Sequence, residues 1–170
     1  MFELMLMRHA KSDWHSHTAD VDRPLNDRGV QDADSMGIYL GKVDLVPDMM
    51  LVSAARRAQE TAARLLNHLP VAENNVIVDR ALYLAERETL CEIIERYAHE
   101  NQRLLLLAHN PGMDDLVSYL ASTPPSRSVS GKLMTTCAVA CFRIDSVEAL
   151  KKSGQGECLN LFRPTHIRHA

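Results

Sequence analysis

The chain has 170 residues, enough for a sizeable buried core, and we expect residues 1–170 to form a single domain. Its 19 lysines and arginines are outnumbered by 22 aspartates and glutamates, so a broad nucleic-acid surface is not expected and any anion site must be a local cluster of cations. The 4 cysteines lack C-x-x-C spacing, which argues against a zinc ribbon. With no secretory leader and no membrane-spanning run in the sequence, we expect buried thiols in a cytoplasmic protein.

The first predicted element is a strand over residues 4–7, an apolar run that leads directly into Arg8 and His9. Such a run suits a strand buried on both faces of a parallel sheet, and ligands of open α/β sheets bind beyond the carboxyl ends of the strands. A guanidinium beside a neutral imidazole fits a nucleophile that receives a phosphoryl group. Taken alone, an Arg-His pair is more often a surface feature than a catalytic one.

Residues 10–25 form a long polar loop, and loops of this length are often functional. Asn26 is the predicted N-cap of a helix that ends near Gly41. Gly29 and Gly37 weaken that helix, which predicts close packing on the sheet.

A second apolar run at residues 49–52 ends at Ser53, the predicted cap of a helix over residues 54–69. Arg56 and Arg57 fall in its first turn, where cations oppose the helix dipole. A shared anion would explain their position, but two solvated surface arginines would look the same in the sequence.

A short third strand over residues 76–78 precedes another helix, whose first turn carries Glu86 and Glu88. Carboxylates in the first turn complement the helix dipole. Any acid–base role of Glu86 therefore competes with capping.

The plainest buried strand covers residues 104–108 and runs into His109. Asn110 as N-cap and Pro111 as the first helical residue predict an immediate helix start. A lone histidine here is more often a packed or capping residue than a catalytic one.

The last third of the chain begins with a loop at residues 122–132 that crosses the surface or the site mouth. Residues 135–144 and 158–162 are strand-like and are expected to pair at the edge of the sheet. Residues 163–170, with His166 and His169, read as a frayed basic tail.

Three strand ends each deliver cationic or imidazole groups, and a parallel sheet brings those ends to one edge. The alternating elements predict a three-layer α/β/α sandwich with a mostly parallel central sheet and an antiparallel edge. Two guanidiniums and two histidines without a neighbouring carboxylate or thiolate predict a phosphoryl pocket rather than a metal site.

Four segments carry a resemblance to a known family. Residues 8–14 (R-H-A-K-S-D-W) resemble the R-H-G-x-S-x-W opening of the histidine phosphatase (phosphoglycerate mutase-like) superfamily, and residues 53–61 (S-A-A-R-R-A-Q-E-T) resemble its S-P-L-x-R-A-x-[QE]-T segment. Residues 107–112 (L-A-H-N-P-G) are similar to the segment of its second histidine. Residues 23–29 (R-P-L-N-D-R-G) are similar to the R-P-L-[TN]-x-x-G of the small SixA-type phosphohistidine phosphatases.

The resemblance implies a phosphoglycerate mutase-like fold and a phosphatase that needs no metal or other cofactor. It implies that His9 accepts the phosphoryl group and that Arg8, Arg57 (not Arg56) and His109 bind its oxygens. The residues implied to contact the substrate are Ser12, His15, Arg23 and Asn110. A second hydrogen bond on His9 should fix its tautomer, and adjacent positive charges should lower its pKa.

Two positions depart from the superfamily pattern. Ala10 replaces the usual glycine, and His15 stands where many members carry an asparagine. The acidic proton donor of larger members has no clear counterpart, and Glu86 is the best substitute. The leaving group of phosphohistidine is an imidazole, which needs less proton donation than an alkoxide. The missing proton donor therefore favours phosphohistidine as the substrate.

The leading hypothesis is a monomeric cytoplasmic phosphatase acting in signal transduction on phosphohistidine in a protein, plausibly a histidine phosphotransfer domain. A phosphatase for small phosphomonoesters and a noncatalytic phosphate- or phosphoprotein-binding module remain as alternatives. No nucleic-acid or membrane partner is expected.

Overall fold

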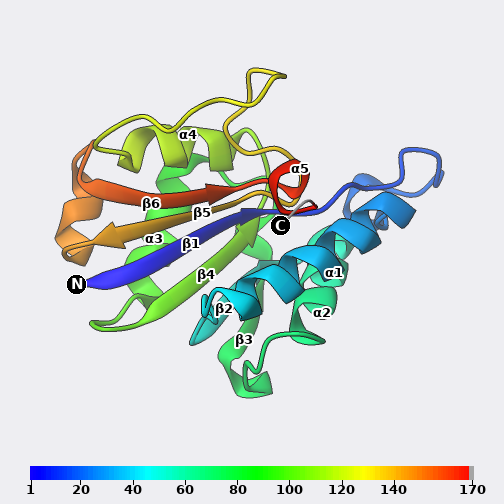
Figure 1. Ribbon diagram of the computed structural model, residues 1–170, viewed down its shortest axis with the longest axis horizontal. Coiled ribbons are helices and arrows are strands. Elements are labelled where there is room, and N and C mark those ends of the chain that lie inside the picture. Colours follow the sequence, from blue (N-terminus) through cyan, green and yellow to red (C-terminus); the bar gives the residue numbers. More distant parts are fainter. Residues whose placement is uncertain (169–170) are drawn as a thin grey trace.

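The computed structural model describes residues 1–168, which contain a six-stranded sheet in the order β3-β2-β4-β1-β5-β6 (Figure 1). The strands are β1 (Phe2–Arg8), β2 (Met49–Ser53), β3 (Val76–Asp79), β4 (Arg103–Ala108), β5 (Val139–Ile144) and β6 (Gly156–Phe162). The first four run parallel, whereas β5 is antiparallel to both β1 and β6. The predicted parallel sheet with an antiparallel edge pair is confirmed.

Helices cover both faces of this sheet, so the predicted α/β/α sandwich is confirmed (Figure 1). One face carries α1 (Asp27–Lys42), α2 (Arg56–Leu66) and α5 (Pro164–Ile167), and the other carries α3 (Arg87–Tyr97) and α4 (Gly112–Leu120). Successive side chains of a strand point to opposite faces. Leu4 and Leu6 of β1 therefore join the core beneath α3 and α4, while Met5 and Met7 join the core beneath α1 and α2. Within residues 1–168, none of the helices is long and apolar enough to span a bilayer.

Two of the predicted helix starts are wrong. Asn26 does cap α1, because its side chain accepts a hydrogen bond from the Gly29 amide at 2.8 Å. The N-cap of α2 is Ala55 rather than Ser53, whose hydroxyl is engaged by His109. Helix α4 starts only at Gly112, because tertiary contacts of the preceding asparagine hold that segment outside the helix.

Gly29 and Gly37 of α1 face other partners than the predicted sheet. A Cβ on Gly29 would overlap the carbonyl oxygen of Lys11, in the loop that follows β1. A Cβ on Gly37 would lie 3.1 Å from the ring of His68, just beyond α2. The close approach at Gly29 fixes the start of α1 against the loop that leads from β1, next to the predicted site.

The predicted frayed tail is also wrong. Arg163 is buried, and its guanidinium donates to the carbonyls of Ser126 at 2.6 Å and Leu133 at 3.0 Å. Ile167 of α5 packs into the core under α1, and Arg168 pairs with Asp32 at 2.7 Å. These partners are more than twenty residues away in the sequence, so local composition did not reveal them. His169 lies outside the described residues.

All four cysteines are free thiols. Cys137 and Cys141 are buried as predicted, whereas Cys91 and Cys158 are only half-buried. Burial raises the pKa of Cys141 to about 12, so this thiol stays protonated at neutral pH.

Candidate active site

A pocket of about 570 Å³ opens at the carboxyl edge of the parallel strands. His9 directly follows β1, Arg57 lies in the first turn of α2 after β2, and His109 directly follows β4. Parallel strands place their carboxyl ends on one edge of a sheet, so the three groups meet there despite their separation in sequence. Arg8, Ser12, Arg23 and Asn110 line the same pocket.

The imidazole of His9 is held in one tautomer. Its Nδ1 lies 2.7 Å from the carbonyl oxygen of Ala10, and because a carbonyl only accepts, Nδ1 carries the proton. The remaining nitrogen, Nε2, is then unprotonated and carries a lone pair. Nε of Arg57 donates to Nε2 at 3.3 Å, which agrees with that assignment. The bond from Nδ1 to the Ala10 carbonyl is the tautomer-fixing hydrogen bond that the sequence analysis expected.

His9 is neutral at physiological pH. Burial first, and then the neighbouring His109, Arg57 and Arg8, together lower its pKa to about 3, against an opposing contribution from the bond to Ala10. Only 7% of the residue is exposed, so little water reaches the ring to stabilise a charge. A neutral imidazole with an unprotonated Nε2 is the form that can act as a nucleophile.

His109 is oriented from both sides of its ring. The Arg57 guanidinium donates to Nδ1 at 3.4 Å, so Nε2 carries the proton and donates to the Ser53 hydroxyl at 2.7 Å. Burial and then Arg57 lower the pKa of His109 to about 4. The rings of His9 and His109 lie 5.1 Å apart, so two uncharged imidazoles border the same small volume.

Arg57 is 2% exposed and uses both edges of its guanidinium. The edge formed by Nε and Nη2 faces His9 and His109, whereas Nη1 and Nη2 donate to the backbone carbonyl of Asp20 at 2.7 Å and to its carboxylate at 3.1 Å. Arg56 is exposed and lies 3.5 Å from Glu60 on the surface of α2. The structure thus places Arg57, not Arg56, in the pocket.

Arg8 adds an unengaged donor. Its Nη1 donates to the Met134 carbonyl at 3.1 Å, and its buried Nε has no hydrogen-bond partner within residues 1–168. Asn110 donates to the same carbonyl at 2.9 Å and accepts from the Asp114 amide at 3.1 Å. Both side chains therefore hold the segment that precedes β5 in place, and this segment lines one side of the pocket.

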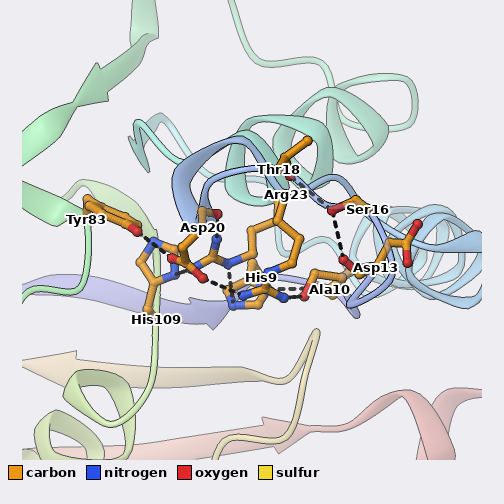
Figure 2. A network of polar contacts seen from close by, with 11 residues as sticks. His9, Ala10, Asp13, Ser16, Thr18, Asp20, Arg23, Tyr83 and His109 are labelled. Carbon is orange, nitrogen blue, oxygen red and sulfur yellow. Dashed lines mark hydrogen bonds and ion pairs between the residues drawn. The ribbon is translucent and has the colours of Figure 1, made fainter.

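Asp20 is a pocket residue that the sequence analysis missed. Its carboxylate accepts from Arg57, from Arg23 at 2.9 Å and from the hydroxyl of Tyr83 (Figure 2). These partners, the Tyr83 hydroxyl first, hold its pKa well below the usual range of an aspartate. Arg23 also donates to the Ser12 hydroxyl and lies 3.7 Å above the indole of Trp14. The length of the polar loop was the available clue, but no periodicity identified Asp20 within it.

Two predicted site residues lie outside the pocket. His15 is exposed, because the turn at Asp13 directs it to solvent after its amide bonds the Asp13 carboxylate at 2.8 Å. Glu86 is exposed at the N-cap of α3 and lines a neighbouring hollow rather than the pocket of His9. Its side chain makes no capping hydrogen bond, so the expected cap is not formed either. Residues 1–168 contain no group of three or more histidine, cysteine or acidic side chains able to hold a metal ion.

A known protein family and a relative match large parts of this chain. The model of the histidine phosphatase superfamily (branch 1) matches residues 4–113. The uncharacterized protein Rv1276c of Mycobacterium tuberculosis (strain ATCC 25618 / H37Rv) is 36% identical over 116 residues, which are 68% of this chain and 70% of that protein.

Solved structures share the fold. The protein histidine phosphatase SixA complexed with tungstate superposes with a TM-score of 0.80 at 22% identity, over 97% of this chain and 99% of that one. A phosphoserine phosphatase from Entamoeba histolytica in complex with 3-phosphoglyceric acid gives a TM-score of 0.68 at 14% identity, over 98% and 100% of the two chains. The family model spans every segment of the pocket from β1 to the start of α4, and the chain belongs to the histidine phosphatase superfamily.

Proposed function

We propose that this protein is a metal-independent phosphatase that hydrolyses phosphohistidine in a protein through a phosphohistidine intermediate on His9. The observation that carries the proposal is the fixed tautomer of His9. Its Nδ1 is tied to Ala10, and its Nε2 faces the guanidinium of Arg57 inside a cationic pocket.

The first step transfers the phosphoryl group to His9. Nε2 attacks phosphorus, a new N–P bond forms and the N–P bond of the substrate breaks. Arg57 and Arg8 donate to the equatorial oxygens and stabilise their charge during in-line transfer. His109 joins them once the negative charge of the phosphoryl group favours a proton on its Nδ1. In the second step water attacks phosphorus, the bond to Nε2 breaks, and inorganic phosphate leaves with the proton that the water gives up.

The leaving group favours phosphohistidine over a phosphate ester. A phosphohistidine that is protonated on its second ring nitrogen departs as a neutral imidazole, so it needs no proton from the enzyme. An alkoxide does need one, and the described lining of the pocket offers no protonated carboxyl, because Asp20 is ionised and Glu86 lies in the neighbouring hollow.

The pocket mouth supports a protein as the substrate. Trp14 is 75% exposed and lines the pocket, as do the exposed Lys11 and Lys132. A phosphohistidine on the surface of another protein reaches His9 only through an open mouth of this kind. We propose a phosphorylated histidine phosphotransfer domain as the partner, with the enzyme acting as a monomer in cytoplasmic signal transduction.

The test is a substrate panel combined with labelling. A phosphohistidine protein should be dephosphorylated faster than sugar phosphates, with acid-labile label trapped on His9. His9→Ala should abolish turnover and labelling, whereas the exposed-residue control His15→Ala should retain both. Selective turnover of esters would identify a phosphomonoesterase instead, and phosphate binding without any N–P bond would identify a binding module.

A further inference from the structure

Asp20 places a negative charge in a pocket whose other charged lining residues are lysines and arginines. Among the described residues that line the pocket it is the one carboxylate, beside Arg8, Arg23 and Arg57. We propose that Asp20 is a built-in counter-anion that weakens the binding of product phosphate and so determines how readily the site empties. This inference rests on the proposed function, since it concerns the product of that reaction.

The geometry separates Asp20 from the place where chemistry occurs. Arg57 turns its Nε–Nη2 edge toward the imidazoles of His9 and His109, and a phosphoryl group on His9 would lie along that edge. The carboxylate of Asp20 accepts from Nη2 at 3.1 Å on the adjoining Nη1–Nη2 edge, so Nη2 serves both edges of the guanidinium. Asp20 therefore does not block the nucleophile, although it shares a cation with the phosphoryl group.

The carboxylate spans two arginines and is itself held in place. One oxygen accepts from Arg23 at 2.9 Å, while the other accepts from Arg57 and from the Tyr83 hydroxyl (Figure 2). A side chain with three donors stays ionised and keeps its position when phosphate enters. Both anions then compete for the same guanidinium and repel each other across it.

This competition matters most for the product. Arginines that bind the phosphoryl oxygens tightly in the transition state also bind free phosphate, and retention of the product lowers turnover. A fixed carboxylate behind Arg57 offsets part of the positive charge without removing the donors that face His9. The pocket keeps its directional hydrogen bonds and loses affinity for free phosphate.

The chain also allows the charge to be removed without moving Arg57. Nη1 of Arg57 donates to the backbone carbonyl of Asp20 at 2.7 Å, and this bond does not depend on the side chain. In Asp20→Asn the amide oxygen still accepts a hydrogen bond while the charge is lost. Asp22→Asn is a matched control, because it removes the same charge from an exposed residue of the same turn that does not line the pocket.

Isothermal titration calorimetry with inorganic phosphate tests the proposal. Asp20→Asn should lower the Kd by about tenfold or more, because a full charge near an arginine-bound anion is removed, whereas Asp22→Asn should change it less than about twofold. Asp20→Ser, which also removes the charge, should tighten binding in the same direction and serves if the asparagine variant does not fold.

Unchanged or weaker phosphate binding in the folded Asp20 variants would overturn the proposal, as would an equal gain in Asp22→Asn. A merely structural role of Asp20 predicts weaker binding, so the sign of the change separates the two. The measurement needs no turnover. Failure of the proposed function would show in the His9 labelling, whereas failure of this inference would show in the Kd.

Discussion

Acidification should destabilise this protein through its two active-site histidines. The pKa of His9 is about 3 and that of His109 about 4, whereas an unfolded histidine titrates near about 6.5. Between those values the unfolded chain binds protons that the folded protein does not. The free energy of unfolding therefore falls as the pH drops below about 6.5, and this contribution levels off only near the folded pKa values.

The size of the effect follows from these pKa differences. At about pH 5 each histidine lies about 1.5 units below its unfolded pKa, and each unit corresponds to about 1.4 kcal/mol. His9 and His109 together should therefore lower the free energy of unfolding by about 4 kcal/mol at this pH. Solvent screens the effect little, because the two residues are 7% and 2% exposed. That loss is a large fraction of the roughly 5–15 kcal/mol by which domains are stable.

Urea denaturation at about pH 7.5 and about pH 5 measures the loss. The comparison is with the double variant His9→Gln/His109→Gln, whose amide side chains do not titrate. Other histidines and carboxylates titrate in both proteins and cancel in the difference. The wild type should lose about 4 kcal/mol more than the variant. Equal losses would show that the two imidazoles are not held neutral by the fold.

Three further predictions follow from individual contacts. Arg57→Ala should lower kcat/KM for a phosphohistidine protein by about 10²–10³-fold, while Arg56→Ala stays near wild type. Equal effects of the two substitutions in steady-state assays would contradict the assignment of Arg57 as the arginine that binds the phosphoryl group. Ser53→Ala should lower the free energy of unfolding by about 1–3 kcal/mol, because the buried His109 nitrogen loses its acceptor, and a denaturation midpoint equal to wild type would contradict that bond. Trp14 is the single tryptophan and lies beside Arg23, so phosphate binding should change the intrinsic fluorescence. A fluorescence titration should give the same Kd as calorimetry, and a titration without any change would contradict the position of Trp14 at the site.

The strand ends were predictable because their signal is local. The uninterrupted apolar runs before His9 and His109 indicate buried parallel strands, and the topology of such sheets then brings those residues together. The choice of Arg57 over Arg56 comes from the resemblance to the superfamily segment, because both arginines lie in the first turn of the predicted helix. Arg57 is buried with the apolar stripe, whereas Arg56 is exposed.

The misplaced cap of α2 and the wrongly predicted tail share one cause, which is that a polar side chain can bond to a distant partner. Ser53 satisfies the usual preference for a helix cap, yet it lies against His109, which is 56 positions away. Arg163 follows the last strand as part of a basic segment, yet its guanidinium is buried against Leu133. Sequence spacing reports neither contact, because hydrogen bonds between distant segments leave no periodic pattern.

The loop of residues 10–25 carries Asp20, the residue proposed to set phosphate affinity, whereas His9 and His109 of the proposed chemistry follow the strands directly. Its ends are fixed, since Ser12 bridges Leu25 and the Asn26 amide donates to the Lys11 carbonyl at 3.0 Å. A loop closed at its base can change its tip without disturbing the strands. Because Asp20 lies in this loop and not on a strand, its substitution would alter the charge of the pocket while His9 keeps its tautomer. Members of a superfamily with one phosphoryl chemistry can thus acquire different affinities through loops alone.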